Sequence, residues 1–154
     1  MVVHNQGQAL CVAVEMERRA IRVYERALAL SPAAEVAEGI RSILSDEREH
    51  LKRFSAMQAE YPVAADEEKL LISGMAAEVL FTGGVMEMHR EHALTTLRGL
   101  YQYAAESEAN AVETYGGFAQ RCQDERVREA FMAIVHEESQ HLTELTEKLR
   151  RMDG

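Results

Sequence analysis

The segment DEREHLKRF, residues 46–54, interrupts an amphipathic helical pattern with two polar side chains on its apolar side. Apolar residues recur here at intervals of three and four, as on the core-facing side of a helix, and Glu47 and His50 fall in that stripe. A buried carboxylate needs a partner that offsets the loss of its hydration. The partners of Glu47 and His50 must therefore come from elsewhere in the chain.

The hydrophobic pattern around this segment predicts an all-helical protein of one domain. With 154 residues, 47% of them hydrophobic, the chain can bury one sizeable core, and its many Ala, Leu, Glu and Arg residues favour helix over strand. In each of four helical stretches a glutamate interrupts the apolar stripe. The segment SPAAE (31–35) is expected to give the second helix an N-cap serine and a first-turn proline. The stretches cover about 8–30, 32–57, 90–122 and 126–150.

The segment between the second and third helices is the one long connection, with a short helical candidate around 67–80. Because short loops join the helices within each pair, each pair is expected to form an antiparallel hairpin, and the long segment can cross the whole bundle. The predicted fold is an all-α four-helix bundle with one long crossover. Its parts are a single domain over 1–154, helical hairpins over about 8–57 and 91–150, and the crossover over about 58–90.

An internal repeat relates the two hairpins. A shift of 91 residues aligns 8–51 with 99–142, and 11 of the 44 aligned pairs are identical. Most of these pairs lie on the inward stripes or beside them, which predicts a pseudo-twofold bundle whose equivalent residues face each other across the centre. The pairs on or beside the stripes are Ala13/Ala104, Glu17/Glu108, Ala20/Ala111, Tyr24/Tyr115, Ile43/Ile134, Glu47/Glu138, His50/His141 and Leu51/Leu142.

The repeat is expected to gather six side chains with metal-ligand chemistry. Glu47 and His50 lie three residues apart on one helix face, and Glu138 and His141 repeat that spacing. Four carboxylates in a bundle core would repel one another, and two divalent cations would cancel their charge. Oxygen and imidazole ligands without a thiolate suit iron or manganese, with zinc as a further substitute. The predicted ligands are Glu17, Glu47, His50, Glu108, Glu138 and His141.

Four motifs on the predicted helices carry a family resemblance. They are EMERRAIRVY (15–24), DEREH (46–50), ESEANAVETY (106–115) and EESQH (137–141). Together they resemble the rubrerythrin family of the ferritin-like superfamily, and the resemblance covers both hairpins. It implies a non-haem diiron-carboxylate oxidoreductase that holds two iron ions per chain and reduces hydrogen peroxide or dioxygen. It also implies that Tyr24 and Tyr115 lie beside the metal ligands, with a role in catalysis.

Two features depart from the rubrerythrin pattern. The chain has no four-cysteine rubredoxin module, so electrons would come from a separate donor such as a rubredoxin-type protein. Ala111 stands where rubrerythrins carry an additional glutamate, one turn beyond the position of Glu108. Both features favour an alternative, an iron-binding or iron-handling protein (ferroxidase, buffering or delivery) without peroxidase turnover. A third interpretation, a purely structural bundle, predicts no bound metal.

Composition and sequence pattern argue against several other classes of function. A net charge of -9 argues against nucleic-acid binding, which depends on Lys and Arg contacts to phosphate. The sequence shows neither a secretory signal pattern nor an apolar stretch that spans a bilayer comfortably, so we expect a cytoplasmic protein without a membrane partner. Cys11 and Cys122 are then expected to be reduced and buried. The apolar segment 70–86 suggests self-association as a homodimer.

Other polar residues are expected at the surface. His89 and His92 could form an accessory metal site near the start of the third helix, but solvation is the simpler interpretation, as it is for His4 and His136. The glutamates expected to form a solvated face are Glu15, Glu38, Glu106 and Glu129.

Overall fold

The computed structural model describes residues 3–30, 32–82 and 94–153, with the side chains of 76–82 left out. Within these ranges the chain forms five helices and no strand, which confirms the predicted all-helical bundle. The helices are α1 (Gln6–Ala29), α2 (Ala34–Glu60), α3 (Ala65–Thr82), α5 (Leu97–Arg121) and α6 (Glu125–Asp153).

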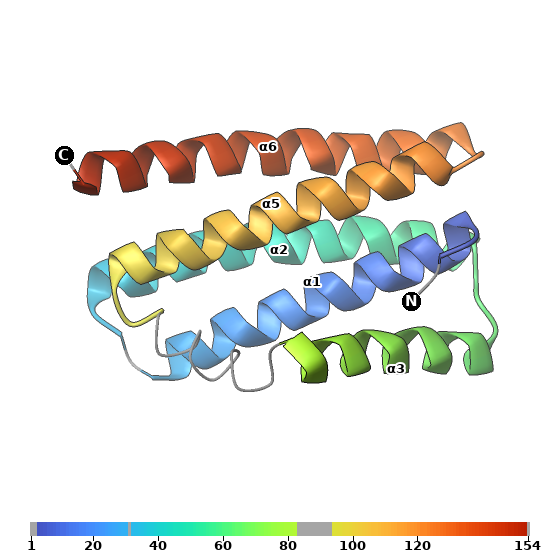
Figure 1. Cartoon of the computed structure of the whole chain (residues 1–154), viewed down its shortest axis with the longest axis horizontal. Coiled ribbons are helices and arrows are strands. Elements are labelled where there is room, and N and C mark those ends of the chain that lie inside the picture. The colour runs from blue at the N-terminus through green and yellow to red at the C-terminus, as the bar shows by residue number, and fades with distance from the viewer. Residues whose placement is uncertain (1–2, 31, 83–93, 154) are drawn as a thin grey trace.

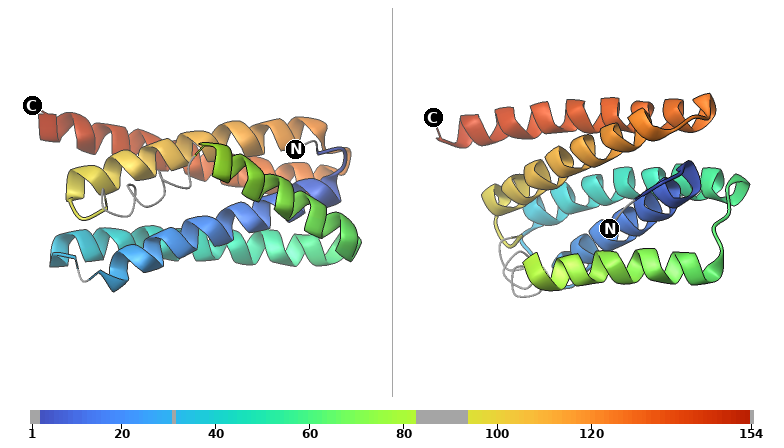
Figure 2. Two further views of the ribbon diagram at one scale, coloured as in Figure 1. Left: turned by 60° about the horizontal axis from the view of Figure 1, so that its bottom comes forward. Right: turned by 45° about the vertical axis from the view of Figure 1, so that its right-hand side comes forward.

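The helices form two antiparallel hairpins, α1 with α2 and α5 with α6 (Figure 1). Helix α3 begins at the end of the bundle where α2 finishes and runs back beside α1, so α5 starts at the same end as α2 and runs parallel to it. Figure 2 shows α3 on the outside of the bundle, at an angle to α1. The crossover is thus largely helical, and it reverses the direction of the chain between the hairpins.

Polar side chains set the starts of α1 and α5. Asn5 Oδ1 accepts a 2.9 Å hydrogen bond from the Gln8 amide, and Thr96 Oγ1 accepts one of 3.0 Å from the Gly99 amide. These contacts satisfy amides that the first helical turn leaves unpaired. The predicted start of the third helix near residue 90 is wrong, because Thr96 caps α5 and the helix begins at Leu97.

The predicted cap of α2 is also wrong. The N-cap is Ala33, which has no side chain to form a capping bond, and the helix begins at Ala34. Ala33 is extended, with φ -53° and ψ 149°, so Pro32 lies in the turn between the helices rather than in the first turn of α2. Ser31 lies outside the described residues.

Two apolar clusters form the core on either side of the bundle's middle. The first, here the aromatic cluster, consists of Phe54, Tyr115, Phe118 and Phe131, with neighbouring ring centroids 5.1–6.5 Å apart. The second, here the aliphatic cluster, consists of Ile21, Ile40, Leu44 and Leu100. Cys11 and Cys122 are free and buried beside the aromatic cluster, as predicted.

Helix α1 is buried on more than one face because α3 packs along its outer side. Seven consecutive residues, 9–15, are buried. Gln8 donates a hydrogen bond to Glu67 of α3, and Glu15 lies on the same side of α1 as Gln8. The predicted solvent exposure of Glu15 is therefore wrong. Glu15 is 8% exposed and pairs with Arg19 and Arg22, at 3.2 and 3.3 Å.

Several expectations fall on residues that the structure does not describe. His89 and His92 lie outside the described residues, as does most of the apolar segment 70–86 at the level of side chains. Within the described helices, none is both long and apolar enough to cross a membrane.

Candidate metal centre

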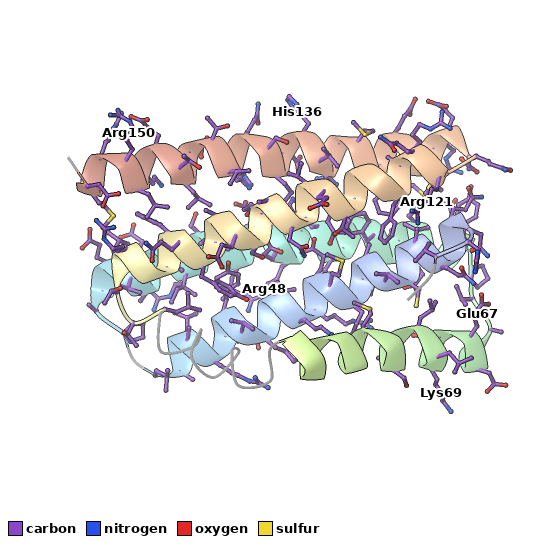
Figure 3. The ribbon with its side chains drawn as sticks, viewed as in Figure 1. Arg48, Glu67, Lys69, Arg121, His136 and Arg150 are labelled. Atoms are coloured by element: carbon purple, nitrogen blue, oxygen red, sulfur yellow. The ribbon has the colours of Figure 1, made fainter. Side chains whose placement is uncertain are left out.

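The six predicted ligands lie at mid-length on the four bundle helices, between the two apolar clusters. Five of them are buried, with exposed fractions of 8% or less, whereas the His141 side chain is 30% exposed. Other polar side chains of α6 point away from the bundle, among them His136 and Arg150 (Figure 3). The centre of the bundle is therefore a polar layer within an otherwise apolar core. Its buried members are Glu17, Glu47, His50, Glu108 and Glu138.

Two groups within this layer could hold a metal ion. One consists of Glu17, His50 and Glu138, and the other of Glu108, Glu138 and His141, with ligand atoms in each group within 4.8 Å of one another. Glu138 belongs to both groups. Five of the six predicted residues are thus brought together as two adjacent three-residue sets with a common carboxylate.

Glu47 is the one predicted ligand outside both groups. Burial raises its pKa well above the usual value for a glutamate, and a hydrogen bond to Glu17 and the charges of Glu17 and Glu138 raise it further. Burial likewise raises the pKa of Glu17. The two carboxyl groups are thus poised to share a proton, which reduces the negative charge of the layer.

The distances at His50 resemble those between ligands of a common ion. His50 Nδ1 lies 2.7 Å from Glu138 Oε1 and 3.9 Å from Glu17 Oε1. Burial lowers the pKa of His50, but the close contact with the Glu138 carboxylate and its charge outweigh burial, and the pKa of His50 is raised overall. On the other side of the layer, His141 Nδ1 lies 3.9 Å from Glu108 Oε1.

The layer also contains buried polar atoms without hydrogen-bond partners among the described residues. Both oxygens of Glu138 belong to this set. One of them lies close to His50 Nδ1, but the geometry of that contact is not that of a hydrogen bond. Unsatisfied buried polar atoms cost free energy, so a cluster of them indicates a missing partner. Two metal ions fit this set of donors in charge and chemistry. The atoms are Glu17 Oε2, His50 Nδ1, Glu108 Oε2, Glu138 Oε1 and Glu138 Oε2.

The two predicted tyrosines occupy different surroundings. Tyr115 Oη donates a 2.9 Å hydrogen bond to Glu17 Oε1, which ties α5 to a candidate ligand on α1. The Tyr24 ring packs edge-on against Tyr103, with centroids 5.6 Å apart. Among the described residues, no hydrogen bond joins Tyr24 to a candidate ligand. Burial raises the pKa of both hydroxyls well above the usual value for tyrosine, so both stay protonated at neutral pH.

Two residues beside the layer were missed by the sequence analysis. Glu137 Oε2 lies 3.0 Å from His50 Nε2, and Arg53 Nη1 donates to both Glu137 oxygens. Partial burial raises the pKa of Glu137, but the hydrogen bond and charge of Arg53 outweigh it, and the pKa is lowered. An ionised Glu137 only accepts hydrogen bonds, so His50 carries its proton on Nε2 and leaves Nδ1 free for a metal. The sequence did contain a signal for Glu137, because an acidic residue directly precedes the glutamate of each Glu-x-x-His motif, Asp46 before Glu47 and Glu137 before Glu138.

No protein-family model matches the chain, and neither the curated proteins nor the solved structures include a significant match.

Proposed function

We propose that this protein is a non-haem diiron-carboxylate protein of rubrerythrin type, which reduces hydrogen peroxide or dioxygen with electrons from a separate donor. The observation that carries the proposal is the pair of Glu/His groups with Glu138 in common, together with the unpartnered polar atoms that they contain. The parallel course of α2 and α5, linked by a crossover, supports a ferritin-like assignment of the bundle (Figure 1).

The donor set is compatible with iron. Each group offers two carboxylates and one imidazole, and neither includes a cysteine. Hard oxygen ligands with imidazole suit iron and manganese, whereas thiolates would favour zinc or copper. Four carboxylates and two neutral imidazoles balance the charge of two divalent ions, and binding would release the protons that the raised pKa values of Glu17 and Glu47 retain.

The two Glu/His groups would hold two iron ions, which would supply two electrons together to the peroxide. The residues of the chain hold the metals, exclude water and store protons. Glu138 lies between the two groups, while Glu17 and Glu108 each belong to one. Reduction of hydrogen peroxide to two water molecules consumes two protons as well as two electrons. Tyr115 keeps a proton beside the centre, because burial raises its pKa.

Anaerobic titration with Fe(II) tests the proposal. We expect two equivalents to bind per chain, followed by a near-ultraviolet absorption change when peroxide is added and recovery when a reductant is supplied. Glu138→Ala removes the residue common to both groups and should lower the stoichiometry below two. Glu129→Ala, an exposed position on the same helix, is the matched control and should bind as the wild type does. Two equivalents bound by Glu138→Ala would overturn the assignment.

The second candidate is an iron-handling protein without peroxidase turnover. Ala111 is partly buried and packs against the apolar cluster around Phe54, so the helix turn after Glu108 presents no further carboxylate to the centre. Repeated cycles of peroxide consumption with a reductant would support the peroxidase. A single oxidation, after which iron is retained or passed to an acceptor, would support iron handling.

A further inference from the structure

His50, the histidine of the first group, is supported by two residues at the ring nitrogen that faces away from the group. His50 Nε2 lies 3.0 Å from Glu137 Oε2, and Arg53 Nη1 donates to Glu137 Oε1 and Oε2 at 3.1 and 2.9 Å. The His50 side chain is 2% exposed. We call the contacts from Arg53 through Glu137 to His50 the clamp.

The histidine of the second group has no comparable support among the described residues. His141 Nε2 lies 3.7 Å from Asp46 Oδ2, which is beyond hydrogen-bond distance, and its side chain is 30% exposed. No other acidic or basic side chain of the described residues lies within ion-pair distance of His141 Nε2. The ring is therefore free to change its orientation and to exchange its contacts with water.

The sequence itself encodes this difference. In the 91-residue repeat, Asp46 is the counterpart of Glu137, and Glu144 is the counterpart of Arg53. The carboxylate behind His141 is thus one methylene shorter, and the position that would supply the cation is acidic instead. The two halves share their candidate ligands but not the residues that orient them.

Such support changes metal binding in a known direction. A carboxylate on the far nitrogen of a ligating imidazole fixes the tautomer, orients the ring and makes the ligand more basic, and its loss typically lowers metal affinity by about 10–100-fold. A free ring must also lose its rotational freedom when it binds. Both effects favour the position that contains His50.

Resting on the proposed function, we propose that the two metal positions are unequal, with one that retains its ion and one that exchanges it. The position formed by Glu17, His50 and Glu138 fills first and binds iron more tightly. The position formed by Glu108, Glu138 and His141 fills second and exchanges its ion with solvent. Arg53 and Glu137 act as positioning residues for the first.

Anaerobic calorimetric titration of the metal-free full chain with Fe(II) tests this inequality. We expect two steps of one equivalent each, with dissociation constants at least about tenfold apart. A chelator added to the loaded protein should remove one equivalent faster than the other. Two equal steps, together with a single rate of release, would overturn the inference while leaving the proposed function intact. Failure to bind any Fe(II) would overturn both.

Substitutions in the clamp assign the steps to the two positions. Arg53→Met keeps an apolar stem and should weaken the tighter step by about 10-fold or more while leaving the weaker step unchanged, whereas Arg53→Lys should restore much of the loss. Arg48→Met is the matched control, because Arg48 is 58% exposed on the same helix and, within the described part of the chain, pairs only with Glu25. A purely structural role for Arg53 would lower the unfolding midpoint without changing one step selectively, and that result would overturn the inference.

The reciprocal change should strengthen the other position. Asp46→Glu combined with Glu144→Arg places the two side chains of the clamp behind His141, and we expect the weaker step to tighten by about 10-fold, so that the two steps converge. If both steps stay as in the wild type while the double variant remains folded by circular dichroism, the clamp does not control affinity and the inference fails.

Discussion

The aromatic cluster and the polar layer lie next to each other on the same helices but differ in how well their groups are satisfied. Phe54 and Phe131 are 1% and 0% exposed and pack with tilted rings whose centroids lie 5.2 Å apart, so their burial is favourable. Glu138 is equally well buried, at 1%, yet neither of its oxygens has a hydrogen-bond partner among the described residues. Burial of the aromatic cluster stabilises the fold, whereas burial of the polar layer destabilises the metal-free protein.

This difference explains how a bundle can hold a cluster of carboxylates before any metal arrives. The aromatic and aliphatic clusters lie on either side of the polar layer and hold the helices at fixed spacing. The layer is then preorganised by its neighbours rather than by its own contacts. A metal ion that binds only the folded state would add its binding free energy to folding. Perturbing the two regions should therefore have opposite effects on the metal-free protein.

The largest expected effect is at the aromatic cluster. Phe131→Ala should lower the free energy of unfolding of the metal-free protein by about 3–5 kcal/mol, because it removes a fully buried ring and leaves a cavity. Urea denaturation followed by circular dichroism measures the loss. Met132→Ala, at a neighbouring position that is 47% exposed, serves as the control and should change stability little. A comparable loss in both variants would contradict the role assigned to the cluster.

A change in the polar layer should act in the opposite direction. Glu138→Leu removes two unsatisfied buried oxygens and should raise the free energy of unfolding of the metal-free protein by about 1–3 kcal/mol. The same variant should lose Fe(II) binding, so that added iron no longer raises its denaturation midpoint. Glu129→Leu, on the exposed side of α6, is the control for a general effect of added apolar surface. Destabilisation by Glu138→Leu would mean that the layer is satisfied without metal.

The sequence predicted these two regions unequally well. Helical periodicity located the four bundle helices, and the repeat identified the polar residues that the fold brings together. Neither could reveal the clamp, because Arg53 and Glu137 come from different helices, and their contact depends on how α2 and α6 are rotated about their axes. The burial of Glu15 escaped prediction for a similar reason, since it depends on where α3 docks. Side-chain stripes indicate which face of a helix is inward, but not which neighbour covers the opposite face.

The stability of the metal-free protein should change less with pH than it does when a whole carboxylate is removed, as in Glu138→Leu. A buried carboxyl group can stay protonated and so avoid part of the cost of burying a charge. Burial raises the pKa of Glu47 and of Glu17, so each contributes stability that is complete below the unfolded-state pKa of about 4.3. That contribution is lost as the pH rises through the folded-state pKa. His50, whose pKa is raised overall, acts in the same direction from about pH 6.5 upward.

Urea denaturation midpoints measured across this pH range test that sign. Glu47→Gln cannot ionise, so its stability relative to wild type should improve steadily as the pH rises above about 4.3. Glu137, whose pKa is lowered, acts in the opposite direction, so Glu137→Gln should lose stability relative to wild type as the pH rises to about 4.3 and show a constant difference above that pH. After loading with Fe(II) the wild-type trend should reverse, because the ligands then bind metal as anions. A flat difference between Glu47→Gln and wild type would show that the pKa of Glu47 is the same in the folded and unfolded states.

The smallest expected effect lies at the boundary between the two regions. Tyr115 belongs to the aromatic cluster through its ring and to the polar layer through its hydroxyl, which donates a 2.9 Å bond to Glu17 Oε1. Tyr115→Phe should lower the free energy of unfolding by about 1 kcal/mol, because a buried acceptor loses its donor while the ring packing remains.

The repeat counterpart of Tyr115 offers a matched comparison, since Tyr24→Phe removes a hydroxyl that is not bonded to a candidate ligand and should change stability less. The two variants, compared by urea denaturation without metal, separate the hydroxyl contribution from that of the ring. Equal losses in both would place the hydroxyl of Tyr24 in the polar layer as well, and the pseudo-twofold symmetry of the repeat would then extend from the candidate ligands to the tyrosines.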